Sequence, residues 1–334
     1  MMRSESGNAM GADLRALARR INRLTELACD LFLNVMIRSL QIFGALLLLG
    51  AVWGLMPSLA KLMMAQGMRP LGIVAIAASI SMVALLLVAA WQHSLPRFTR
   101  AHLRHYLLGG FIGMALANLF AFTGLQRAPA GLFALLVPLA GLFSVMLFAM
   151  AGLDRATPRR IAGALLGLGG VMLAMAPGAA LPDPALLPWA AIMLLTPVCY
   201  AVANLISVKL AVPGSPPVAQ AAGTVMGAAL TSVLLAIPMG HLTLPANGTV
   251  ALLLLTHGLL NALGYLTYFR LLVSAGGIVT SQTSLTLTLC GLLYGYLIFA
   301  EVPGWLTIPA VMLIFGGLLL VTLPPRRKLS PAGS

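Results

Sequence analysis

Charged residues are scarce in this chain of 334 residues: they make up 8% of it, and only 7 residues are acidic. Soluble domains carry roughly a quarter of charged residues, so the composition excludes an ordinary soluble protein. Hydrophobic residues account for 60%, and they form runs of about 20 residues, the length that crosses a bilayer as a helix. The short alternating segments of a transmembrane barrel are missing. The sequence therefore predicts an all-α integral membrane protein.

Cysteine is also rare, with only Cys29, Cys199 and Cys290 in the chain. All three lie in apolar surroundings without metal-ligand spacing, so we expect packing residues, no metal site and no cofactor. No cleavable signal segment is visible at the N-terminus. A net charge of +13 would suggest nucleic acid as a partner of a soluble protein. Here Lys and Arg lie in loops and tails, so the expected partner is the lipid bilayer and not nucleic acid.

No carboxylate lies near the middle of an apolar run, so proton antiport through a central Asp or Glu has no carrier. His257 is the titratable group expected at bilayer depth. This favours facilitated diffusion or weakly coupled transport. An intramembrane enzyme is not expected either, because Ser144 and Ser284 lack a Gly-x-Ser-Gly context and His257 has no metal-ligating companion in its span.

Ten transmembrane helices are predicted, with both termini in the cytoplasm. In this orientation 17 of the 20 Lys and Arg residues lie on the inner side, and only Lys61, Arg69 and Arg127 lie outside. Before the first span, leucines at helical spacing opposite several arginines predict an amphipathic helix on the cytoplasmic leaflet. The alternative is a mis-assigned start, with Met36 as the first residue. The predicted spans are 42–64, 70–91, 105–124, 129–152, 160–177, 188–210, 217–238, 249–270, 276–299 and 304–323.

An internal duplication organises these spans. Landmarks between Ala128 and Pro177 recur in the same order 147 positions later, where Asp154 meets Glu301. Five spans per half is an odd number, so the halves enter the membrane in opposite orientations, as in many secondary transporters. The fold prediction is therefore a 5+5 inverted repeat. Its parts are a cytoplasmic tail with a basic amphipathic helix (1–41), a first five-helix repeat (42–177), an outer linker (178–187), a second five-helix repeat (188–323) and a basic cytoplasmic tail (324–334).

Several short motifs in this frame resemble a known family. These motifs are Trp53-Gly54 with Lys61 two turns on, Ala130-Gly131 leading to Pro138, and an acidic residue before a Gly-Gly helix in each half. Together they resemble the EamA-type branch of the drug/metabolite transporter superfamily. The resemblance covers residues 42–323. It implies a carrier in the inner (plasma) membrane that exports amino acids, other metabolites or toxic compounds.

Polar residues at bilayer depth usually face the bundle interior, because they are costly in lipid. Trp53 shares a helix face with Pro57 and Lys61, and the repeat superposes Tyr200 on Trp53. His257, Asn261, Tyr265 and Tyr268 form another stripe. We predict a small zwitterionic or amphipathic substrate, such as an amino acid, moved by alternating access. The predicted lining of the cavity is Trp53, Asn118, Tyr200, Asn204, His257, Asn261, Tyr265 and Gln282.

Each candidate also has a structural interpretation. His257 is alternatively a packing residue, and the Ser/Thr run that starts at Ser281 can bond back to helix carbonyls. Lys61 can snorkel, while Asp154 and Glu301 are expected to cap the helices that follow them. Glycines four apart serve packing within the chain, with a homodimer as the alternative. The alternative function is a non-transporting sensor or assembly factor that docks through the basic N-terminal helix.

Overall fold

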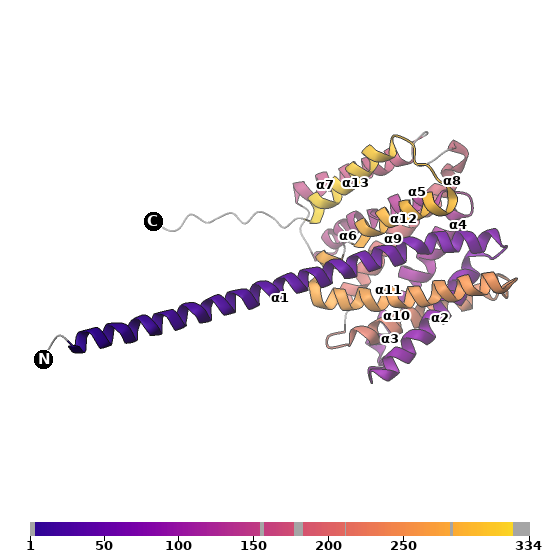
Figure 1. Ribbon diagram of the computed structural model, residues 1–334. Coiled ribbons are helices and arrows are strands. Elements are labelled where there is room, and N and C mark those ends of the chain that lie inside the picture. The colour runs from indigo at the N-terminus through magenta and orange to yellow at the C-terminus, as the bar shows by residue number, and fades with distance from the viewer. Residues whose placement is uncertain (1–3, 154–156, 177–182, 211, 281–282, 323–334) are drawn as a thin grey trace. The chain divides into compact units, whose positions relative to one another are not determined.

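The computed structural model describes residues 4–153, 157–176, 183–210, 212–280 and 283–322 (Figure 1). Every regular element in these ranges is helical. Seven helical stretches are long and apolar enough to cross a membrane, and two more apolar helices, Thr283–Phe299 and Thr307–Leu320, are shorter. The prediction of an all-helical membrane protein is thereby confirmed.

The chain divides into two compact units, Met1–Ala45 and Leu46–Ser334. α1 (Ser4–Ala65) is helical throughout the described part of the first unit and continues into the second. The backbone of the predicted amphipathic segment is thus helical. Its side chains up to residue 31 lie outside the described part. The remaining helices belong to the second unit.

Proline and threonine begin several helices of this unit, as their preferred conformations suit a helix start. Pro70 begins α2, which coincides with the predicted span 70–91. Thr157 caps α7 by accepting a hydrogen bond from Arg160 N at 3.4 Å. The elements are α2 (Pro70–Trp91), α3 (Arg100–Gly110), η1 (Phe111–Leu116), α4 (Ala117–Leu125), α5 (Ala130–Leu136), α6 (Leu139–Met150), α7 (Pro158–Ala174), η2 (Pro184–Leu186), α8 (Leu187–Met193), α9 (Leu195–Lys209), α10 (Pro217–Ala236), α11 (Gly248–Thr280), α12 (Thr283–Phe299) and α13 (Thr307–Thr322).

Three spans are interrupted at particular residues. Pro138 has no N–H to donate and separates α5 from α6. The π-helix η1 widens the helical run between α3 and α4. Gly276 breaks α11 with φ +80° and ψ 167°, a conformation that favours glycine. This break coincides with the predicted start of the ninth span at residue 276.

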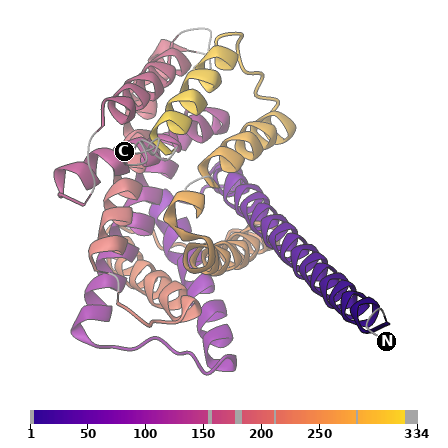
Figure 2. The ribbon, with the colours of Figure 1, turned by 90° about the vertical axis from the view of Figure 1, so that its left-hand side faces the viewer.

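Helices related by the offset of 147 positions pack against each other. α7 lies beside α13 in both ribbon views (Figures 1 and 2), and α2 packs on α10. α12, whose counterpart by this offset is α6, packs instead on α5, the helix just before α6. The crossed contacts have the same pattern, since α2 also packs on α11 and α10 on α3. Helices α2, α3, α5 and α7 are therefore interleaved with helices α10 to α13 rather than folded separately from them.

Closely spaced glycines make these contacts possible within the chain. A Cβ added at Gly317 on α13 would lie 2.7 Å from Gly167 N on α7, and one at Gly291 on α12 would lie 2.6 Å from the Ala134 Cβ on α5. Small residues that let helix backbones approach closely are typical of packing in lipid. The predicted intramolecular use of these glycines is confirmed for these contacts.

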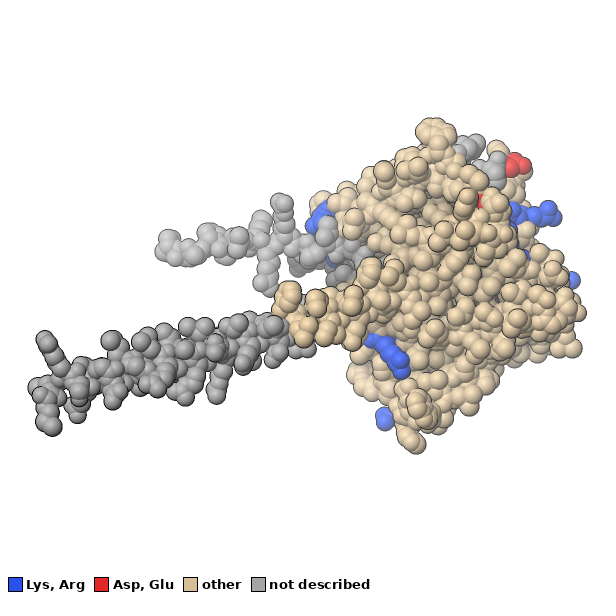
Figure 3. Space-filling model, in the orientation of Figure 1, with Lys and Arg blue, Asp and Glu red and all other residues tan. Residues whose placement is uncertain are grey.

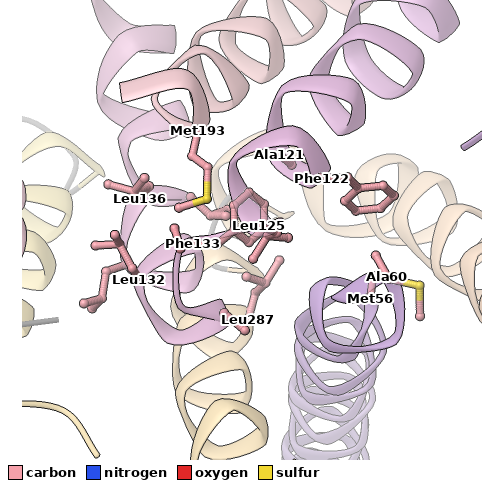
Figure 4. Close-up of a cluster of buried hydrophobic side chains, with 14 of the residues drawn as sticks. Met56, Ala60, Ala121, Phe122, Leu125, Leu132, Phe133, Leu136, Met193 and Leu287 are labelled. Carbon is pink, nitrogen blue, oxygen red and sulfur yellow. The ribbon is translucent and has the colours of Figure 1, made fainter. Parts of the chain in front are cut away.

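The largest apolar core joins α1, α4, α5, α8 and α12 (Figure 4). Phe122 and Leu125 of α4 lie near Met56 and Ala60 of α1, while Leu287 of α12 and Met193 of α8 close the other sides. All of these side chains are almost fully buried. Tight packing of this kind replaces the hydrophobic effect as the source of helix association in a bilayer.

The exposed surface has the character expected in lipid. In the face shown in Figure 3, Lys and Arg lie toward the two ends of the helical body, and the band between them is uncharged. Large apolar side chains such as Leu165, Met172 and Leu234 are exposed on the outside of the helices. Such an apolar belt between charged ends fits the hydrocarbon layer of a membrane.

Candidate functional site

An aromatic cluster joins α1 and α11. The indole ring of Trp53 lies 5.7 Å from the Tyr265 ring in an edge-on arrangement and 5.5 Å from the Tyr268 ring, centroid to centroid. Gly264 makes this possible, because a Cβ there would lie 3.0 Å from Cε2 of Trp53. Phe269 closes the cluster at 5.4 Å from Tyr268. The structure thus brings together two residues of the predicted lining, Trp53 and Tyr265.

Tyr200 on α9 belongs to the same region. Its side chain and that of Tyr268 lie close enough to Tyr265 for electrostatic interaction. All three tyrosines, like Trp53, are half-buried. Aromatic rings with polar tips are suited to solutes that are part apolar and part polar.

Asn261 bridges α11 and α2 next to this cluster. Its Nδ2 donates to Oγ of Ser81 on α2 at 3.1 Å, and Ser81 Oγ donates to the carbonyl of Gly258 at 2.7 Å. Met114, in the π-helix η1, lies 4.0 Å from the same amide nitrogen. Asn261 is buried, so its amide fixes the contact of α2 with α11 and does not face an open space.

His257 lies one turn before Asn261 on α11 and is only 4% exposed. Neither ring nitrogen has a hydrogen-bond partner in the described part of the chain. The Phe122 ring of α4 meets the imidazole edge-on at a centroid distance of 6.0 Å. The structure therefore places His257 behind Phe122 and sealed in the core.

The remaining predicted residues are more scattered. Asn204 on α9 donates from Nδ2 to Oγ of Ser144 on α6 at 3.0 Å, which ties these two helices together. Asn118 is half-buried on α4. Gln282 lies outside the described residues. The eight predicted residues thus divide into an aromatic group, two bridging asparagines, a sealed histidine, Asn118 and an undescribed glutamine.

Threonines of α12 confirm the structural interpretation for two members of the Ser/Thr run. Thr286 Oγ1 donates to the carbonyl of Leu46 at 2.8 Å, and Thr288 Oγ1 donates to that of Ala134 at 2.8 Å. Both hydroxyls also contact carbonyls of their own helix. These side chains satisfy backbone groups and tie α12 to α1 and α5.

A charged cluster that the sequence did not predict lies at the end of the first span. Lys61 Nζ is 2.7 Å from Oε1 of Glu301 and 3.3 Å from the carbonyl of Ala128, and it lies 4.8 Å above the Phe299 ring. The Glu301 carboxylate accepts hydrogen bonds from Ala130 N at 2.9 Å and Gly131 N at 2.8 Å.

This cluster corrects two expectations. Glu301 caps α5, not α13, the helix that follows it in the chain. Lys61 forms an ion pair instead of snorkelling freely. The sequence did hold a signal, because Lys61 shares a stripe with Trp53 and Glu301 is a landmark of the repeat. Asp154, the counterpart of Glu301, lies outside the described residues.

Other features offer no competing site. A groove of about 640 Å³ runs along α7 and α13, lined by apolar residues such as Leu165 and Leu313, and it contains none of the predicted residues. No group of three His, Cys, Asp or Glu side chains that could hold a metal occurs within the described ranges. The polar groups enclosed among α1, α2, α9 and α11 are therefore the candidate site.

Apolar spans that enclose polar and aromatic side chains define a multi-pass membrane protein with a polar interior. The sequence model of the EamA-like transporter family matches residues 31–176. The family resemblance predicted from the sequence is thereby confirmed over residues 31–176.

Two individual proteins are similar to this chain. A Pseudomonas aeruginosa protein, described only as uncharacterized, is 29% identical over 221 residues, which are 65% of this chain and 74% of that protein. A solved structure, titled only as the crystal structure of a protein, aligns with a TM-score of 0.61 over 86% of this chain and 98% of the other. Its sequence identity is 23%, so this likeness concerns the fold alone.

Proposed function

We propose that this protein is a carrier that exports amino acids or similar small metabolites across the inner (plasma) membrane, with both termini in the cytoplasm. In this proposal, two inverted five-helix halves alternate around a central site. The observation that carries it is the group of neighbouring, half-buried aromatic side chains Trp53, Tyr200 and Tyr265, which in this proposal come from both halves.

The packing of the helices supports the inverted repeat. Under a pseudo-two-fold axis in the membrane plane, helices near the axis meet their own counterparts. α2 with α10 and α7 with α13 are such pairs. Two interleaved halves of this kind can rock against each other about the site between them, as in other inverted-repeat carriers.

The chemistry of the site supports a neutral or zwitterionic solute with an apolar part. The aromatic rings offer stacking surfaces, and their hydroxyl and indole groups offer hydrogen bonds at the edge. A cationic amino group also interacts favourably with aromatic faces. An amino acid carries all three features: a cationic amino group, a hydrogen-bonding carboxylate and an apolar side chain.

Counterflow into proteoliposomes tests the proposal. Vesicles with the purified full chain are loaded with each of the 20 proteinogenic L-amino acids in turn, and uptake of the same radiolabelled amino acid is measured. We expect accumulation for at least one. Tyr265→Ala should reduce it at least ten-fold. Tyr296→Ala is the matched control, because Tyr296 is 55% exposed on the outside of α12 and its loss should leave uptake within two-fold.

Two results would contradict the proposal. If no amino acid accumulates, the amino-acid assignment is wrong. If Tyr265→Ala and Tyr296→Ala transport equally well, the aromatic group is not the site. Direction is tested separately in cells, where an exporter should lower the intracellular level of the amino acid identified by counterflow.

A further inference from the structure

His257 has an environment that a packing residue would not be expected to have. A neutral imidazole carries one N–H donor and one lone pair, and here both nitrogens are buried without a partner among the residues that the structure describes. An unmade hydrogen bond in apolar surroundings is unfavourable, and the large majority of buried polar side chains avoid it. The described conformation therefore leaves His257 in an unfavourable state that another conformation can relieve.

The neighbouring polar groups cannot provide that relief where they are. Ser81 Oγ donates to the Gly258 carbonyl, and Asn261 donates to Ser81 Oγ, so the groups beside His257 are engaged with each other. The backbones are also too close for rearrangement in place, since a Cβ at Gly258 would lie 3.0 Å from the carbonyl oxygen of Ala77. A change in the contact between α2 and α11 would give the imidazole access to a partner.

No ionisable side chain stands ready to balance a charge on the ring. The elements packed against this part of α11, namely α2, α4 and α10, contain no titratable residue. On α1, residues 46–65 contain only Lys61, which pairs with Glu301. On α11 itself the titratable groups that follow are Tyr265, Tyr268 and Arg270. An imidazolium would be an unpaired buried cation, so the described state accommodates only the neutral ring.

The position of His257 couples it to the movement that the carrier function requires. α11 belongs to the second half of the repeat, whereas α2 and α4, which cover the ring, belong to the first. Rocking of one half against the other opens or closes this contact. Water, and therefore a proton, can reach the ring only when it is open.

We propose that His257 is the proton-binding site of the transport cycle, neutral in the state described and protonated in the state in which the α2–α11 contact opens. The proton comes from water on one side of the membrane, binds the imidazole lone pair, and leaves to water on the other side. No covalent bond or electron transfer is involved. This inference rests on the proposed carrier function and adds a proton to its cycle.

Proton movement per amino acid is the quantity to measure. Proteoliposomes with the full chain contain the pH-sensitive dye pyranine, and an equimolar mixture of the 20 L-amino acids is added outside, each radiolabelled in turn. The wild type should move protons in a constant ratio to amino acid. In His257→Gln this ratio should fall at least ten-fold, whatever the remaining rate. His257→Phe, which suits the apolar surroundings, is the second variant if Gln does not fold.

His93→Asn is the matched control. His93 is exposed in the turn after α2 with φ +50°, a conformation that Asn tolerates, and its ratio should equal the wild type's. Amino acid flux without proton movement in the wild type, or an equal ratio in His257→Gln, would overturn the inference and leave the carrier function standing.

If the wild type transports no amino acid, the proposed function is contradicted and the ratio cannot be measured. Protonation of His257 is then tested without amino acids. The chain is labelled with ¹⁵N in its histidine rings, placed in lipid nanodiscs and titrated from pH 7 to pH 4 by NMR. His257 is assigned from the signal missing in His257→Gln. Because protonation needs an opening step, neutral and charged forms should give two separate signals in slow exchange. A single moving signal, or no protonation, would overturn the inference.

Discussion

The ammonium group of Lys61 lies 2.7 Å from the carboxylate of Glu301, across 240 positions of the chain. Their side chains are 25% and 18% exposed, respectively. The same carboxylate accepts two backbone hydrogen bonds at the start of α5. The pair therefore connects the first, fourth and ninth predicted spans at one end of the bundle.

Glu301 accepts hydrogen bonds from three donors, whereas Lys61 contacts mainly one acceptor. We therefore expect replacement of Glu301 to reduce the stability of the fold more than replacement of Lys61. Lys61→Met should lower the free energy of unfolding by about 1 kcal/mol, and Glu301→Ala by about 2–3 kcal/mol, since it orphans two backbone N–H groups as well. Thermal unfolding in detergent gives the comparison. Lys209→Met is the control, because Lys209 is exposed near the end of α9.

A charge exchange sharpens this prediction. An isolated ion pair is restored when its partners are exchanged, but a lysine at position 301 cannot accept hydrogen bonds from Ala130 N and Gly131 N. The double variant Lys61→Glu, Glu301→Lys should therefore remain as unstable as Glu301→Ala. Recovery of the wild-type Tm would show that the pair acts through charge alone.

The contact of α5 with α12 depends on the absence of a side chain at Gly291. In Gly291→Ala the new methyl would lie 2.6 Å from Cβ of Ala134, and we expect a loss of about 1–3 kcal/mol from overpacking. The double variant Gly291→Ala, Ala134→Gly also removes the methyl group of Ala134, and it should recover most of the lost stability. Gly169→Ala is the control, since a Cβ there meets nothing within 4 Å. Equal stability of the two alanine variants would contradict the prediction.

His241, in the loop between α10 and α11, should make the fold sensitive to acid. Burial, and secondly the charge of Arg69, hold the pKa of its imidazole below the usual value of 6.5. The unfolded chain then binds more protons than the folded one as pH falls below about 6.5, so stability is lost on acidification.

Apparent Tm measured between pH 7 and pH 5 tests this. His241→Gln should reduce the downward slope, and Arg69→Gln should reduce it by less, because Arg69 is the smaller cause. A slope unchanged in His241→Gln would mean that this histidine contributes nothing to the acid sensitivity.

The spans were predictable because hydropathy is a local property. α2 matches its predicted bounds, and the break at Gly276 lies where one predicted span gives way to the next. The aromatic stripe was predictable for the same reason: Tyr265 and Tyr268 share a helix face by spacing alone. The partners of polar groups were harder to predict. Glu301 was expected to cap the helix after it, yet it caps α5.

The sequence by itself thus determined that the chain is helical, that it lies in a membrane, and which residues share a face, since these follow from composition and helical period. Only the tertiary structure decided that Lys61 meets Glu301, that Asn261 meets Ser81, and that His257 meets no hydrogen-bond partner in the described part of the chain. These outcomes depend on which helices pack together across a hundred or more positions. In a bilayer, that choice is made by close packing of small residues, and periodicity along one helix carries no information about its neighbour.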